Sequence, residues 1–318
     1  MALGKRFIPH SISVKSAVPA VSAWIDEVES YGPDQGVELF EESAGSEIDR
    51  EFVAIKAVSP NMPINTKDLT FIGTCGMDGI GISPDSTNPG IVAYGREVVS
   101  GSLPTGISTT NHMKMVVSDG RMVPLKMQAS HNQSASLQLM LHAVLGTTPT
   151  YSQAAPMVFS RNNAIASGAS ALTKLFTTGP VKFDSVLAQG IMDIAVDFGH
   201  KVDVESDSGD VYPSFVTTSS RKPKIMFTTK DQELIASIGD GVAISSLFTA
   251  YFRKVSQNNQ RVAVGTAQHI SVAGTKGVIV PGTYGMKHQT PGTTGFTFVP
   301  SKDTVIMTVS TSATIPTS

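Results

Sequence analysis

Short apolar runs separated by turn-forming residues dominate the chain. Runs rich in Val, Ile, Met and Phe occupy 90–99, 114–127, 222–229 and 305–315. Gly, Pro, Asn or Asp interrupts the chain between them, which is typical of β-strands joined by turns. Residues 66–76 and 228–239 depart from this pattern, because each opens with Thr and Asp and closes on Gly, as a capped short helix does. We therefore expect a mainly β protein with two short helices.

The two halves of the chain share a series of residues in the same order. When the sequence is aligned with itself so that His112 meets His269, several further identities fall into place. They are Tyr94/Tyr251, Arg96/Arg253, Gly120/Gly277 and Pro124/Pro281. Further upstream, Phe52-Val53 meets Phe215-Val216 and Thr66-Lys67-Asp68 meets Thr229-Lys230-Asp231. This collinear order indicates a tandem duplication.

Each repeat reads as a small antiparallel β domain, a sandwich or barrel segment with one flanking helix. The Gly120 and Gly277 positions suit hairpin turns that need positive φ. Pro124 and Pro281 favour an edge strand or a strand start, because proline has no N–H to donate.

Composition suggests the following domain boundaries. We expect an N-terminal arm at 1–20 and a first domain at 21–145. A linker rich in Ala, Ser, Thr and Gly follows at 146–180, with a weaker third helix at 163–176, and a second domain occupies 181–318.

Charge and cysteine content narrow the functional classes. The chain has 318 residues, 41% hydrophobic, and a formal net charge of −2, which argues against a protein that grips nucleic-acid phosphates. Its one cysteine, Cys75, excludes an intrachain disulfide, and we expect it to be a packed side chain. With no long apolar segment at the N-terminus or elsewhere, we expect a soluble protein from a reducing compartment, with no membrane insertion.

No constellation of residues points to catalysis. His112 and His269 lack metal-ligand spacing, so we expect each to be a strand histidine that hydrogen-bonds a neighbour. The acidic stretch 203–210 resembles a calcium loop, but its Gly is displaced and Ser214 stands at the twelfth position. We therefore expect no enzyme, no metal and no cofactor.

Acidic residues are concentrated at matching positions of the two repeats. Residues 26–51 hold ten acids and one base, Arg50, and residues 193–210 also carry an acidic excess. A solvated surface is the usual explanation for such runs, and a shared electrostatic role is the alternative.

The repeat unit resembles the tail-tube domain of long-tailed bacteriophages. The motif that carries the resemblance is Pro-x-Ile-x-Phe-Thr-Thr-Lys-Asp, a short helix to Gly, Asp-Gly, and then the His strand, Gly and Val-Pro. The likeness covers roughly 20–145 and 180–318, and it is closest to major tail tube proteins that carry this domain twice. It implies two packed antiparallel sheets flanked by a helix, with a long loop reaching a neighbouring ring.

The resemblance also implies a function. Three such chains would form a trimeric, pseudo-hexameric ring, and stacked rings would form a hollow tube in the virion tail, assembled in the host cytoplasm. Its partners would be further copies of the chain, tail-tip or baseplate and tail-terminator proteins, and a tape measure protein in the lumen. Double-stranded DNA would pass without specific binding. Because a negative wall repels phosphates, we expect part of an acidic set to face the lumen. That set is Glu38, Glu41, Glu42, Asp203, Glu205 and Asp207.

Two alternatives remain at this point. A baseplate, distal-tail or tail-terminator protein would use the same fold without forming the tube. A carbohydrate- or partner-binding module is the other class, although one Trp and six Tyr offer few aromatic platforms.

Overall fold

Antiparallel β-sheets make up most of the protein, as the sequence predicts. The computed structural model describes residues 6–16, 20–42, 50, 52–85, 88–99, 104–146, 154–166, 174–206, 209–231, 233–239, 241–245, 247–256, 260–287, 290–302 and 306–317. Every strand pairing in this part of the chain is antiparallel, and the helices are short.

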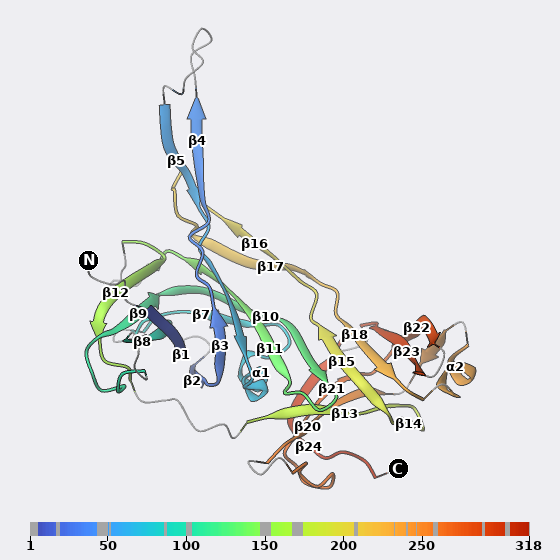
Figure 1. Ribbon diagram of the computed structural model, residues 1–318. Coiled ribbons are helices and arrows are strands. Elements are labelled where there is room, and N and C mark those ends of the chain that lie inside the picture. The colour runs from blue at the N-terminus through green and yellow to red at the C-terminus, as the bar shows by residue number, and fades with distance from the viewer. Residues whose placement is uncertain are drawn as a thin grey trace.

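A ten-stranded sheet runs through the middle of the molecule (Figure 1). The first half of the chain contributes β3 (Val28–Tyr31), β6 (Asn61–Thr66), β7 (Ile80–Ile82), β10 (Asp119–Ser130) and β11 (Ser136–Val144). The second half contributes β15 (Ile191–Asp197), β18 (Lys224–Thr229), β19 (Val242–Ile244), β22 (Gly277–Lys287) and β23 (Thr290–Pro300). The order is β19-β22-β23-β18-β15-β10-β11-β6-β3, with β7 paired to β10.

Two five-stranded sheets pack against it, one from each half. The first has the order β12-β9-β8-β1-β2 and the second β24-β21-β20-β13-β14. The first comprises β1 (Arg6–Ser16), β2 (Val21–Ile25), β8 (Ile91–Val98), β9 (His112–Val117) and β12 (Met157–Asn163). The second comprises β13 (Phe176–Phe183), β14 (Val186–Ala188), β20 (Phe248–Lys254), β21 (His269–Gly274) and β24 (Thr308–Ala313). Strands at matching places in the two halves therefore pair in the same order.

Each half also sends out a two-stranded hairpin. One pairs β4 (Val37–Glu42) with β5 (Phe52–Val58), and the other pairs β16 (His200–Glu205) with β17 (Phe215–Arg221). The β4–β5 hairpin projects from the molecule, and β16–β17 lies beside its base (Figure 1).

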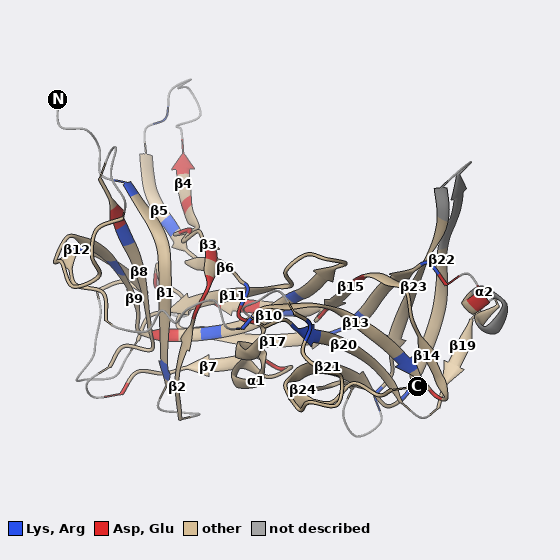
Figure 2. Ribbon diagram, turned by 60° about the horizontal axis from the view of Figure 1, so that its bottom comes forward, with Lys and Arg blue, Asp and Glu red and all other residues tan. Residues whose placement is uncertain are grey.

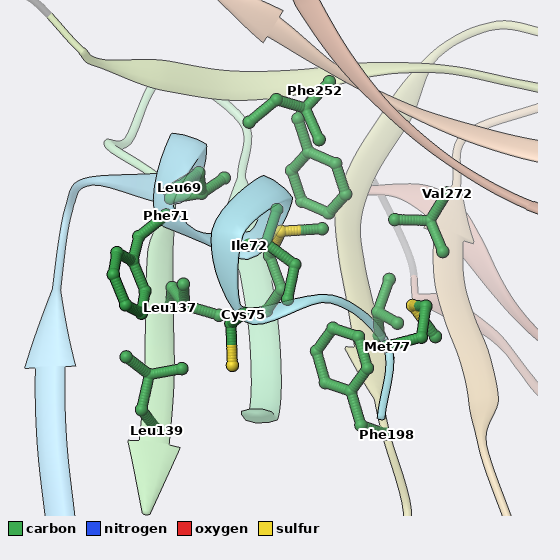
Figure 3. Packing of buried hydrophobic residues seen from close by; sticks show 14 of the residues in the cluster. Leu69, Phe71, Ile72, Cys75, Met77, Leu137, Leu139, Phe198, Phe252 and Val272 are labelled. Atoms are coloured by element: carbon green, nitrogen blue, oxygen red, sulfur yellow. The ribbon is translucent and has the colours of Figure 1, made fainter. Parts of the chain in front are cut away.

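One hydrophobic cluster joins the sheets of both halves. Alternate residues of β11, such as Leu137, Leu139 and Leu141, are fully buried, because successive side chains of a strand point to opposite faces. Figure 3 shows Phe198 and Phe252 of the second half in the same cluster as the first half's short helices. The two halves thus share one core.

The two short helices lie where the sequence predicts them. They are η1 (Leu69–Phe71) continued by α1 (Ile72–Cys75), and α2 (Glu233–Ile238). Asp68 accepts a hydrogen bond from Thr70 N at 3.1 Å, and Asp231 accepts one from Glu233 N at the same distance. These carboxylates accept from backbone N–H groups in the first turn, which have no hydrogen-bond partner within the helix.

The expected domain boundaries need correction. Residues 6–16 of the expected arm form β1, which lies between β8 and β2. Residues 157–163 of the expected linker form β12, and β13 begins at Phe176. The described ends of the weaker helix candidate, Asn163 and Phe176, are therefore strand residues, and 167–173 lie outside the described residues. β12 (MVFSRNN) is mostly exposed and lacks the alternation of apolar and polar residues that reveals a strand in sequence.

The expectation of hairpin turns at Gly120 and Gly277 was wrong. Gly277 is the first residue of β22 and Gly120 the second residue of β10, both in the ten-stranded sheet, and the strands before them, β9 and β21, belong to the five-stranded sheets. Glycine is needed because a Cβ would collide with a backbone carbonyl across the sheet, that of His142 or of Val299. Of these two glycines, Gly120 alone has a positive φ, 152°.

Pro124 and Pro281 lie inside strands, not at strand starts. On one side of β10, β7 pairs with residues up to Met122 and β15 pairs from Lys126 onward. Pro124 falls in the gap, where no neighbouring strand needs its N–H. A bulge follows each proline, between Pro124 and Lys126 and between Pro281 and Tyr284.

Candidate functional site

Strands β10 and β15 join the two halves of the chain into one sheet. Residues 126–130 of β10 pair with 193–197 of β15, with Lys126 opposite Asp197 and Ser130 opposite Asp193. Phe198 N donates to Leu125 O at 3.0 Å, and His131 N donates to Met192 O at 2.6 Å. Because N–H groups alternate in direction along a strand, the backbone N–H groups of Met127 and Ala129 also point toward β15.

The turn between β10 and β11 makes a second contact between the halves. Ala135 N donates to Phe176 O of β13 at 2.7 Å. Arg261 donates to Asn132 Oδ1 at 3.0 Å. The end of β10 is thereby held on the second half by backbone and side-chain bonds together.

The base of the β16–β17 hairpin makes the third contact, with the first half. His200 Nε2 lies 2.9 Å from Met77 O, and Arg221 forms an ion pair with Asp78. In the loop that joins β16 to β17, Val211 O accepts a hydrogen bond from Val58 N at 2.9 Å. The second hairpin therefore lies over the outer face of β10 and β11.

The strands equivalent to this junction have open edges at the two ends of the sheet. β3 matches β15, and both have a register shift at the same place, between Val28 and Ser30 and between Ile191 and Asp193. Within the described residues, β3 pairs only with β6, and β22 beyond Ile279 pairs only with β23. An open edge exposes unpaired N–H and C=O groups to another strand.

The bonds between β3 and β6 show which backbone N–H groups of β3 point toward its open edge. Gly32 N and Asp34 N donate to Pro63 O and Asn61 O of β6, at 3.2 and 2.8 Å. By alternation, the N–H of Tyr31 faces the open edge. Pro33 has no N–H. The open edge of β3 therefore offers one backbone donor fewer than the edge of β15 that pairs with β10.

His112 and His269 hold equivalent loops, as the sequence predicts for strand histidines. Each is fully buried. His112 Nδ1 accepts from Glu97 N at 3.1 Å, and its Nε2 lies 2.9 Å from Gly106 O. His269 Nδ1 accepts from Lys254 N at 3.1 Å, and its Nε2 lies 3.0 Å from Ala263 O.

Arg96 and Arg253 fix the same loops from the neighbouring strands. The Arg96 guanidinium donates from Nε to Thr105 O at 2.6 Å, and that of Arg253 donates to Val262 O at 3.0 Å. The repeated His and Arg residues are therefore structural, and their ring and guanidinium nitrogens bond to backbone groups.

A partly buried ion cluster joins Lys174, whose side chain is 31% exposed, to two buried carboxylates far away in the sequence. Lys174 Nζ lies 3.2 Å from Asp26 and 2.8 Å from Asp68, whose side chains are 7% and 1% exposed. Burial acts to lower the pKa of Lys174, but the bonds and charges of Asp68 and Asp26 outweigh it and raise the pKa. The only signal in sequence was the acidic run, which suggested a solvated surface for Asp26.

The proposed acidic set lies on the two hairpins. Glu38, Glu41 and Glu42 are exposed on β4, where Figure 2 shows acidic residues gathered. Asp203 and Glu205 lie on β16, and Asp207 is outside the described residues. Some of these charges are paired locally, since Arg50 lies 2.9 Å from Glu41 and Lys56 lies 3.6 Å from Glu38.

Cys75 is a packed side chain, as expected. It is 1% exposed and lies in the cluster around α1 (Figure 3). Burial raises the pKa of its thiol to about 12, so the nucleophilic thiolate is scarce at neutral pH.

The described ranges contain no group of three or more His, Cys, Asp or Glu side chains placed to hold a metal ion. In the same ranges, no helix has the length and apolar character needed to cross a membrane.

Comparison of the sequence with models of known protein families and with curated proteins gave no match.

Proposed function

We propose that this chain is a structural subunit that associates with further copies of itself, edge to edge, to form the tail tube of a long-tailed bacteriophage. The pairing of β10 with β15 is the observation that carries the proposal. Within one chain it joins two repeats, and the matching strands β22 and β3 remain open at the ends of the same sheet. A second copy can repeat the contact there.

A contact that uses two different edges is heterologous and closes into a ring when its rotation allows. Three chains, each with two repeats, would give a trimeric ring with pseudo-sixfold symmetry. Closure would leave no open edge in the ring, which removes a common cause of aggregation. Rings stacked on one another would form the hollow tube.

The open face of the ten-stranded sheet suits the wall of a DNA passage. On the face opposite the core, uncharged polar side chains lie among the charged side chains of Lys126, Asp193, Asp197 and Lys224; they include Asn65, Gln128, Ser136, Gln138, Thr228 and Thr297. Among its charges, Lys224 lies 3.5 Å from Asp197. A wall of this kind offers DNA phosphates few fixed cations, so the DNA can slide. Tail-tip, terminator and tape measure proteins would be the other partners in this assembly.

Electron microscopy of the purified, concentrated protein tests the proposal. We expect rings or end-on tubes with three chains per turn. The variant Met286→Pro removes an N–H that faces the open edge, because Met286 matches Ala129, and proline is tolerated on strand edges. We expect this variant to remain monomeric and Met286→Ala, which keeps the N–H, to assemble.

Single rings without stacking would favour a terminator or baseplate part. A wild-type protein that stays monomeric at every concentration and salt condition, even with a tail-tip complex added, would contradict the proposal.

A further inference from the structure

Two valines at matching positions differ sharply in burial. Val123 in β10 is fully buried, although it lies on the strand face opposite the core residue Met122. Val280, its equivalent in β22, is 43% exposed. Val278 and Val299 beside it are 43% and 48% exposed. We call Val278, Val280 and Val299 together the valine patch.

Two segments lie against β10 near Val123, namely Gly79, whose Cβ position is 2.9 Å from a Val123 methyl carbon, and the hairpin base of the second half. β16 and β17 lie against β10 and β11, held by the His200–Met77 bond and the Arg221–Asp78 ion pair. No described segment takes the equivalent place over β22 and β23, so the valine patch stays open. The groove beside the patch is lined by Ile244, Pro300 and neighbouring residues.

The β4–β5 hairpin is the equivalent of the hairpin that covers Val123. Val37 pairs with Val58, as His200 pairs with Arg221, and each hairpin has a register shift after its second residue pair. Unlike β16–β17, it carries a series of exposed apolar side chains. They are Val37, Leu39, Phe40, Phe52, Val53 and Ile55, each more than 40% exposed. Apolar surface of this extent marks an interaction site.

The chemistry of the two potential contacts differs in a matched way. In the contact within one chain, the polar residue His200 lies near Arg121. Burial is the main cause that lowers the pKa of His200, and the charge of Arg121 lowers it further. At the equivalent positions, Val37 takes the place of His200 and Val278 takes the place of Arg121. The contact within the chain therefore pairs two polar residues, His200 and Arg121, and the contact between copies would pair two apolar residues, Val37 and Val278. Each hairpin thus matches the chemistry of its own docking surface.

We propose that the valine patch binds the base of the β4–β5 hairpin of a second copy of this chain. This contact rests on the proposed edge-to-edge association, and it adds apolar burial to the backbone bonds between β22 and β3. Each copy would then use its valine patch toward one neighbour and its β4–β5 hairpin toward the other, because the base of the β16–β17 hairpin is already engaged within its own chain.

Cross-linking of mixed single-cysteine variants tests the contact. Val37→Cys and Val278→Cys proteins are mixed, treated with a short bismaleimide and separated by denaturing gel. We expect a cross-linked dimer in the mixture and in neither variant alone, because the two cysteines meet only between different copies. Native Cys75 is buried and does not compete. A mixture of Val37→Cys with Val158→Cys is the matched control, since Val158 is exposed on β12.

The same samples viewed by electron microscopy separate the two proposals. Rings that form with no more Val37–Val278 cross-link than the control would overturn the valine-patch contact and leave the edge-to-edge association standing. Absence of both rings and cross-links would overturn both.

A charge in the patch provides an independent readout of association. Val280→Asp places a carboxylate where the hairpin would cover it, so we expect self-association to weaken on the order of tenfold or more. Val158→Asp should leave it unchanged. Equal association of Val280→Asp and wild-type protein would also overturn the contact.

Discussion

The ring of His269 accepts a hydrogen bond from the backbone N–H of Lys254 at 3.1 Å, in a fully buried position. His112 accepts one from Glu97 at the same distance. Each histidine thereby connects its own strand to the strand beside it, and its second nitrogen reaches the loop between those strands. At both matching positions the histidine therefore holds a strand and a loop together.

Replacement of His269 by alanine should destabilise the protein. The change leaves Lys254 N without its acceptor in a partly buried place, and we expect a loss at the lower end of the about 1–3 kcal/mol that a buried unpaired donor costs. Denaturant unfolding followed by far-UV circular dichroism measures the loss. His131→Ala is the control, because the His131 side chain is exposed and the residue's bond to Met192 O is donated by its backbone N–H. Equal stability of the two variants would refute a structural role for His269.

The contribution of His269 should also depend on pH. Burial lowers the pKa of His269 below its usual 6.5, and the charges of Arg253 and Lys254 act in the same direction. The unfolded chain therefore binds a proton first as pH falls, so the stabilisation is present above pH 6.5 and is lost below it, toward the folded pKa. We expect the stability gap between wild type and His269→Ala to narrow in that window, by at most about 1.4 kcal/mol per pH unit. A gap that widens on acidification would contradict this assignment.

Removal of the Lys174 ammonium should be costly. Lys174→Met removes an ammonium, on a side chain 31% exposed, that lies against the buried carboxylates of Asp26 and Asp68, and we expect a loss at the lower end of the about 3–5 kcal/mol that breaking a buried pair costs. Lys56→Met is the matched control, because Lys56 and Glu38 are both more than half exposed, and such surface pairs contribute about 0–1 kcal/mol. Thermal and denaturant unfolding of both variants measure the difference. Similar losses would mean that the ion cluster has no special role.

Gly277→Ala should destabilise the second half through backbone crowding. A Cβ on Gly277 would lie 2.6 Å from a ring carbon of Phe298 and would collide with the carbonyl of Val299. We expect a loss of about 1–3 kcal/mol, since the sheet backbone cannot shift freely. Gly81→Ala is the control, because its Cβ would meet no atom within 4 Å. Calorimetric unfolding compares the two, and an unchanged Gly277→Ala protein would disprove the crowding.

Cys75 should react with thiol reagents only when the protein unfolds. Its thiol is buried and its pKa is about 12, so both access and thiolate are lacking in the native state. Ellman's reagent at neutral pH should release one equivalent of product in guanidinium and almost none in buffer. Fast reaction in buffer would show that the cluster around α1 opens readily.

Sequence by itself determined the elements that depend on local chemistry. Apolar runs of strand length predicted the mainly β fold, and Asp68 with Gly76 and Asp231 with Gly239 predicted the two short helices. The repeated residues also predicted that His112 and His269 would occupy matching places, because the same short segment folds in the same local way in each half.

Only the tertiary structure decided how strands pair over long distances. Residues 6–16 and 157–163 looked like an arm and a linker, yet they form β1 and β12, because each strand is held by a partner far away in the sequence. The same reason hid the crowding at Gly120 and Gly277, where the limiting atom lies across the sheet.

The contrast between Val123 and Val280 shows the limit most clearly. The two residues are identical and lie at matching positions in sequence, and no local pattern separates them. Val123 is buried beside Gly79 and the second hairpin and Val280 is exposed, because the chain contains one junction between its two halves and two open ends of the sheet. Sequence determined what each repeat is made of, and tertiary packing decided which of its surfaces remain open.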